Sequence, residues 1–175
     1  FWRRDRGSTT NGRSLGVSTR SPETSFLGSH VNKLDAKGRV AAPAEFRRAL
    51  EGEHGRGFYC LMGVKEDRLE CGGGDFITTY KRYIATLAPL SDERELLEDH
   101  ILGSVRFLAF DTEGRIVIPE VFRDFAKLKD RVCFKGRGDH FIIVDADADA
   151  ENMARMRPAA RKAIIELRAK LEGLK

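Results

Sequence analysis

One sequence pattern occurs twice in this chain. The first copy, residues 34–50, is Leu34-Asp-Ala-Lys-Gly-Arg-Val-Ala-Ala-Pro-Ala-Glu-Phe-Arg-Arg-Ala-Leu50, and the second copy, residues 110–126, is Phe110-Asp-Thr-Glu-Gly-Arg-Ile-Val-Ile-Pro-Glu-Val-Phe-Arg-Asp-Phe-Ala126. The copies align without a gap and share six residues in the same order: Asp35, Gly38, Arg39, Pro43, Phe46 and Arg47, then Asp111, Gly114, Arg115, Pro119, Phe122 and Arg123. Such self-similarity indicates that one supersecondary unit is used twice.

The similarity continues downstream, where residues 58–61 and 68–71 correspond to residues 132–134 and 141–144. Each half is therefore predicted to run turn, strand, short helix, strand, turn, strand. Units of this size expose too much surface to bury a core alone. We expect the two halves to pack together as one pseudo-symmetric body.

The repeated residues have a local structural meaning. Asp35 can accept backbone N–H groups in a turn, and Gly38 can supply the positive φ of a tight reversal. Arg39 is predicted to open a strand, and Pro43 to start a helix ending at Leu50, because the first helical position does not need an N–H. The matching structural positions of the second copy are Asp111, Gly114, Arg115 and Pro119.

The composition indicates a single compact domain with tails. The chain has 175 residues, of which 41% are hydrophobic and 33% charged, and no apolar run of membrane-spanning length. We expect a soluble, cytoplasmic protein. The predicted organisation is a disordered basic extension over 1–25, a first repeat over 26–90, a linking helix over 91–103, a second repeat over 104–157 and a C-terminal helix over 158–175.

Charge differs between the two copies. Residues 26–50 contain five basic and two acidic residues, whereas residues 110–130 contain four basic and five acidic ones. This asymmetry favours a division of labour in which the first copy meets a polyanion and the second supports the fold. The alternative for Arg39 and Arg115 is that both only form ion pairs with Asp35 and Asp111.

Other signals have structural interpretations. The three cysteines, Cys60, Cys71 and Cys133, lack zinc-site spacing and are expected to pack in the core. The acids at 145, 147 and 149 favour a helix start over a calcium loop, and Gly72–Gly74 favours a flexible turn over a phosphate loop. We therefore expect no metal, no cofactor, no small-molecule substrate and no enzymatic activity.

Helices are predicted from apolar spacing. One follows the Gly72–Gly74 break, another follows a cap at Ser91, and a third begins at Pro158. The third carries an apolar stripe at Ala160, Ile164, Leu167, Leu171 and Leu174. That stripe is expected to cover the protein's own core, with a subunit contact as the alternative.

The segment Phe26-Leu-Gly-Ser-His-Val-Asn-Lys-Leu-Asp-Ala-Lys-Gly-Arg-Val40, together with the second Asp-x-x-Gly-Arg-x-x-x-Pro-x-x-Phe-Arg copy, resembles the MraZ family of bacterial transcriptional regulators. The family is related to AbrB-type and MazE-like swapped-hairpin proteins. The resemblance runs from about Phe26 to the C-terminal helix.

The resemblance implies a β-rich α+β fold, a double-split β-barrel built from two swapped-hairpin repeats, assembled into a homo-oligomeric ring. It implies binding to G-rich direct repeats of double-stranded DNA before the division and cell-wall gene cluster. Arg39 would contact bases, while Lys33, Lys37 and Asn32 would contact phosphates, which suits arginine as a reader of guanine. The alternative is an antitoxin-like module that holds a protein partner with the same fold.

Overall fold

The computed structural model describes residues 25–51 and 55–173. The predicted extension over 1–25 lies almost wholly outside these residues, as does Leu174 of the C-terminal stripe. The first half contributes β1 (Ser29–Lys33), β2 (Arg39–Ala41), α1 (Ala44–Leu50), β3 (Gly57–Met62) and β4 (Leu69–Gly72). The second half contributes β5 (Arg106–Ala109), β6 (Arg115–Val117), α4 (Glu120–Phe125), β7 (Arg131–Gly136) and β8 (Phe141–Asp145).

Three helical segments lie between the halves and one follows them. The connecting segments are α2 (Gly74–Ala85), α3 (Asp92–Leu97) and the π-helical turn η3 (Glu98–Leu102), and the last element is α5 (Ala146–Glu172). Ser91 caps α3 as predicted, because its hydroxyl accepts the N–H of Arg94. The predicted order of turns, strands and short helices is confirmed. Each half has one additional strand at its start, β1 in the first and β5 in the second.

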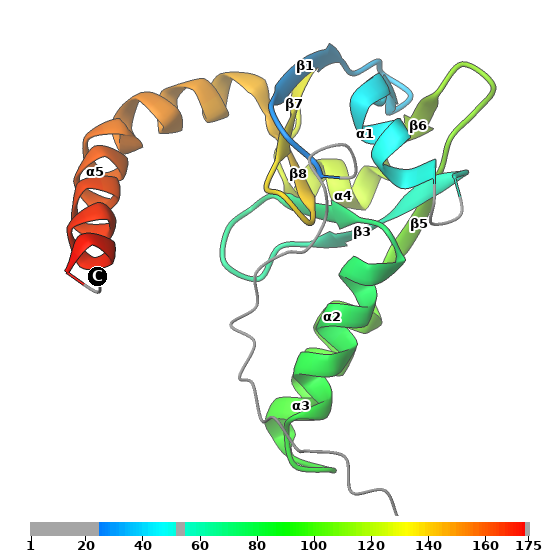
Figure 1. Ribbon diagram of the computed structural model, residues 1–175. Coiled ribbons are helices and arrows are strands. Elements are labelled where there is room, and N and C mark those ends of the chain that lie inside the picture. Colours follow the sequence, from blue (N-terminus) through cyan, green and yellow to red (C-terminus); the bar gives the residue numbers. More distant parts are fainter. Residues whose placement is uncertain (1–24, 52–54, 174–175) are drawn as a thin grey trace, which may run out of the picture.

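The strands form a symmetric, antiparallel arrangement (Figure 1). Six of them lie in the order β1-β7-β8-β4-β3-β5, and β2 pairs separately with β6. In the six-stranded sheet each half's first strand pairs with the other half's third strand, β1 with β7 and β5 with β3. The halves are thus interleaved in a β-rich α+β fold, and the described residues form an open sheet and a ribbon, with no closed barrel.

Two backbone hydrogen bonds repeat this exchange. The N–H of Leu34 donates to Asp130 O at 2.8 Å, and the N–H of Phe110 donates to Arg56 O at 2.7 Å. Since Leu34 and Phe110 occupy the same place in the two repeats, the halves hold each other through equivalent contacts. This confirms that they pack as one pseudo-symmetric body.

The main core is aromatic and draws on both halves. The ring of Phe141 lies 4.9 Å from those of Phe26 and Phe58 and 5.1 Å from that of Phe46, measured between centroids. A second, smaller cluster forms under the connecting helices around Leu61, Phe76, Ile84 and Ile101. The halves therefore share one core, which neither could enclose alone.

All three cysteines are buried and free. Cys60 and Cys71 face each other across β3 and β4, with their sulfur atoms 3.4 Å apart. Burial raises the pKa of the Cys71 thiol well above its usual value. The prediction that the cysteines are core residues is confirmed.

The Gly72–Gly74 segment corrects a sequence prediction. It is a tight junction in which Gly72 ends β4, Gly73 precedes α2, and Gly74 begins it. A Cβ on Gly72 would lie 2.5 Å from the Cβ of Phe76. Close packing of the strand against the helix, and not flexibility, explains the glycine.

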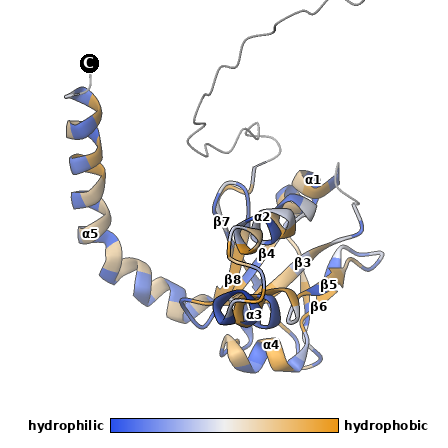
Figure 2. Cartoon of the chain, turned by 90° about the horizontal axis from the view of Figure 1, so that it is seen from below, coloured by the Kyte–Doolittle hydropathy of each residue, from blue (hydrophilic) through white to orange (hydrophobic). Residues whose placement is uncertain are grey.

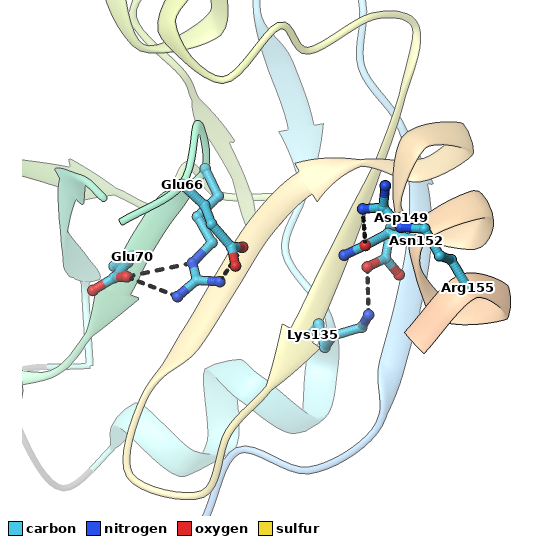
Figure 3. A network of polar contacts seen from close by, with 7 residues as sticks. Glu66, Glu70, Lys135, Asp149, Asn152 and Arg155 are labelled. Carbon is cyan, nitrogen blue, oxygen red and sulfur yellow. Dashed lines mark hydrogen bonds and ion pairs between the residues drawn. The ribbon is translucent and has the colours of Figure 1, made fainter. Parts of the chain in front are cut away.

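The C-terminal helix also differs from its prediction. It begins at Ala146, where the carboxylate of Asp145 accepts the N–H of Ala148, so the acidic cluster is a helix start as expected. Pro158 lies inside α5 and not at its beginning, and the helix bends along its length (Figure 1). Ion pairs of Lys135 with Asp149 and Arg131 with Asp147 attach the first turns to β7, and Figure 3 shows the former.

Beyond these first turns, α5 leaves the body of the protein (Figure 2). Every described residue from Met153 onward is exposed, including Ile164, Leu167 and Leu171. The expectation that the apolar stripe covers the chain's own core is therefore wrong. Pro158 lies near the middle of α5, in the part of the helix that extends away from the body of the protein.

Candidate nucleic-acid interface

Two short loops carry the repeated residues. The first loop (residues 35–39) leads into β2, and the second loop (residues 111–115) leads into β6. In the β2–β6 ribbon Arg39 is opposite Val117 and Ala41 is opposite Arg115. Because the strands are antiparallel, the loops lie at opposite ends of a three-residue ladder.

Asp35 organises the first loop. Its Oδ1 accepts the N–H groups of Lys37 at 2.9 Å and Arg39 at 2.8 Å, while its Oδ2 accepts Nε of Arg39 at 2.7 Å. Gly38 has φ of 78° and donates its N–H to Asp35 O. The predicted turn, with its acceptor carboxylate and its positive-φ glycine, is confirmed.

The second loop has the same internal bonds. Asp111 accepts the N–H groups of Glu113 and Arg115, each at 2.9 Å, and Nε of Arg115 at 2.8 Å. Gly114 has φ of 73°. The sequence difference between the copies therefore leaves the loop backbone unchanged.

Both aspartates are stabilised as carboxylates. The pKa of Asp35 is lowered from its usual value by the backbone N–H and then the side chain of Arg39. The pKa of Asp111 is lowered in the same way by Arg115, whose own pKa is raised chiefly by the bond to Asp111. Each loop thus holds a charged pair at neutral pH.

The loops differ in how completely their arginines are neutralised. Arg115 also pairs through Nη1 with Glu113 at 2.8 Å, so two carboxylates surround its charge. The equivalent of Glu113 is the exposed Lys37, and Arg39 has Asp35 as its one carboxylate partner among the described residues. Its terminal nitrogens carry no hydrogen bond within the described parts of the chain. The first loop consequently presents an arginine fork and a lysine to solvent.

The remaining predicted contacts flank the first loop. Lys33 is exposed at the end of β1. Asn32 donates from Nδ2 to Ala41 O at 2.7 Å, which ties β1 to β2. Sequence reasoning missed this bond, because the two residues are distant in the chain. Lys33, Lys37 and Arg39 thus lie on or next to the first loop. The hydrogen bond of Asn32 joins the two strands that flank this loop.

Clusters of metal-ligating side chains and membrane-spanning helices are both absent from the described parts of the chain. No group of three or more histidine, cysteine or acidic side chains able to hold a metal occurs within residues 25–51 and 55–173. Over the same ranges, no helix has the length and apolar character needed to cross a bilayer. The exposed cationic side chains of the first loop, Lys37 and Arg39, are of the kind that binds an anionic surface.

Comparisons with known proteins find relatives that match most of the chain. Residues 101–148 match the family model described as "MraZ protein, putative antitoxin-like". The Transcriptional regulator MraZ of Caulobacter vibrioides (strain NA1000 / CB15N) is 35% identical over 150 residues, covering 86% of this chain and 96% of the relative. The protein of the same name from Phenylobacterium zucineum (strain HLK1) is 37% identical over 144 residues, covering 82% and 89%.

Proposed function

The chain belongs to the MraZ family of transcriptional regulators, and from that premise we propose that it binds double-stranded DNA sequence-specifically through its first loop. The target is a set of G-rich direct repeats in the promoter of the division and cell-wall gene cluster. Arg39 contacts bases, and Lys33 and Lys37 contact phosphates. The protein then acts as a nucleoid-associated regulator and not as an enzyme.

One observation carries this proposal: two loops with the same internal hydrogen bonds differ in their outward charge. Arg115 pairs with Asp111 and Glu113, whereas Arg39 pairs with one carboxylate among the described residues, that of Asp35, and lies near Lys37 in the same loop. An arginine fork with free terminal nitrogens can donate to O6 and N7 of guanine. Arg39 retains that capacity, while Arg115 would have to leave two carboxylates.

Assembly of several subunits raises the DNA affinity above that of one small loop. We propose a homo-oligomeric ring of double-split β-barrel subunits, in which several first loops contact successive DNA repeats. Linked contacts raise the effective concentration of each further loop. The exposed apolar side chains of α5, including Ile164, Ile165 and Leu171, support a role for that helix in subunit contact.

The test is a fluorescence-anisotropy titration of the full chain against labelled DNA with several G-rich direct repeats and against a scrambled control. We expect a preference for the repeats of about a hundredfold or more, and weaker binding at higher salt. Equal, weak binding to both DNAs would overturn the proposal. It would favour the alternative, an antitoxin-like module that binds a protein partner.

A matched pair of variants locates the interface. Arg39→Ala is expected to lose specific binding and to keep the oligomeric mass measured by light scattering. Arg115→Ala removes the same side chain from the equivalent loop and is expected to affect stability or assembly more than specificity. Equal DNA binding by the two variants would refute the division of labour between the loops.

A further inference from the structure

The last residue of the repeated pattern, Arg47 in the first copy and Arg123 in the second, has no role in the interface described above. Arg47 lies on α1 and Arg123 on α4. Both side chains are partly buried, and Nε of each is buried without a hydrogen-bond partner among the described residues. The same atom is therefore enclosed in both repeats, which indicates a shared function of the side chain.

Each arginine lies against the loop of the opposite repeat. A Cβ built on Gly38 would lie 3.1 Å from Nε of Arg123 and 3.5 Å from its Cδ. A Cβ built on Gly114 would lie 2.5 Å from Nη1 of Arg47 and 2.6 Å from its Cζ. The two contacts are reciprocal, so each glycine admits the planar guanidinium group of the other half.

Backbone hydrogen bonds also join each loop to the opposite repeat. The N–H of Ile118 donates to Gly38 O at 2.8 Å, and the N–H of Ala42 donates to Gly114 O at 3.0 Å. Each loop is thus held on one side by the residue that follows a strand, Ile118 after β6 or Ala42 after β2, and on another by an arginine, both from the opposite repeat. The position of Arg39 therefore depends on the second half of the chain.

We propose that Arg123 is a positioning residue for the first loop, and that Arg47 is its counterpart for the second loop. The inference rests on the proposed function for its effect on DNA. Removing the guanidinium group leaves the glycine turn without support on one face. The loop then samples more conformations, and the Arg39 fork is presented less often in its binding geometry.

The chain offers a matched pair of test variants, Arg123→Met and Arg47→Met. Both remove one positive charge and a planar group from equivalent sites, while keeping an unbranched stem. Hydrogen–deuterium exchange with mass spectrometry on the full chain reports the loops directly, through the bonded N–H groups of Lys37 and Arg39 in the first loop and Glu113 and Arg115 in the second.

In Arg123→Met we expect exchange in residues 34–42 to accelerate about fivefold or more, with little change in residues 110–118. Arg47→Met should give the reverse pattern. Equal acceleration of both segments in both variants, or none in either, would overturn the positioning role. This readout does not involve DNA, so it stands or fails separately from the proposed function.

DNA titrations of the same variants complete the test. Arg123→Met should bind the repeat DNA about tenfold more weakly, and Arg47→Met should bind it about as tightly as the unchanged chain. The dependence of log affinity on log salt should be unchanged in Arg123→Met; a slope reduced by about 0.9 would mean a lost phosphate contact and overturn positioning. Loop-specific exchange without any DNA effect would uphold the positioning of the loop and count against the proposed DNA site.

Discussion

Gly38 and Ile118 belong to different repeats and meet through their backbones. The N–H of Ile118 donates to Gly38 O at 2.8 Å, and a Cβ on Gly38 would lie 2.6 Å from Ile118 O. The first loop therefore approaches the backbone directly after β6 as closely as a residue without a side chain allows.

Gly38→Ala should destabilise the protein more than Gly114→Ala. Both glycines have positive φ, which costs another residue about 1–2 kcal/mol. Alanine at 38 would also meet the backbone oxygen of Ile118, which cannot move freely, so the total should exceed about 2 kcal/mol. Alanine at 114 would meet the end of the Arg47 side chain, which can rotate away. Urea unfolding of the two variants measures the difference, and equal midpoints would contradict it.

The second loop should lose stability in acid. The pKa of Asp111 is lowered by N–H donors of Arg115 in the folded state, so its contribution is complete above the ordinary value of 3.8 and is lost as pH falls through the lower folded pKa. Asp111→Asn should therefore be less stable than the unchanged chain at pH 7, with the difference shrinking below about pH 4. Urea unfolding at several pH values checks this, and a gap independent of pH would contradict it.

Phe141→Ala should be among the most damaging core substitutions. The residue is 1% exposed, and its ring, which belongs to the second half, packs against the rings of Phe26 and Phe58 of the first half, so its removal should cost about 3–5 kcal/mol. Phe107→Ala is the control, because that ring is 46% exposed and its substitution should cost about 1 kcal/mol. Thermal unfolding of both variants measures the two losses of stability. Similar losses of stability in the two variants would refute the assignment of the core.

Tyr80→Phe should weaken the attachment of α2 to the sheet. The hydroxyl of Tyr80 donates to Oε2 of Glu70 at 2.6 Å, and Arg68 donates to the other carboxylate oxygen, a bond drawn in Figure 3. Burial, followed by the bond to Glu70, raises the pKa of Tyr80. Loss of one donor to a buried carboxylate should cost about 1–3 kcal/mol.

The control for that substitution is Tyr83→Phe on the same helix. Tyr83 is 66% exposed, so its substitution should change the free energy of unfolding by about 0.5 kcal/mol or less. Urea unfolding of the two variants should separate them clearly. Identical curves would mean that the bond between Tyr80 and Glu70 contributes nothing to stability.

The sequence by itself determined the local features of both halves. The turn at Asp35, the positive φ of Gly38 and the caps at Ser91 and Asp145 follow from bonds between residues at most four positions apart. Rules for turns and helix ends depend on such neighbours alone. The duplicated pattern added the pseudo-symmetry, and the exchange of Lys37 for Glu113 indicated which loop keeps an available arginine.

Only the tertiary structure decided how the halves interlock. The pairing of β1 with β7 and of β5 with β3, and the contact of Arg123 with the first loop, join residues from opposite halves of the chain. The start of α5 was also misjudged, because the cap at Asp145 and the ion pairs to β7 sustain a helix through Pro158. Contacts between distant segments depend on which surfaces the folded chain brings together, and local spacing carries no information about them.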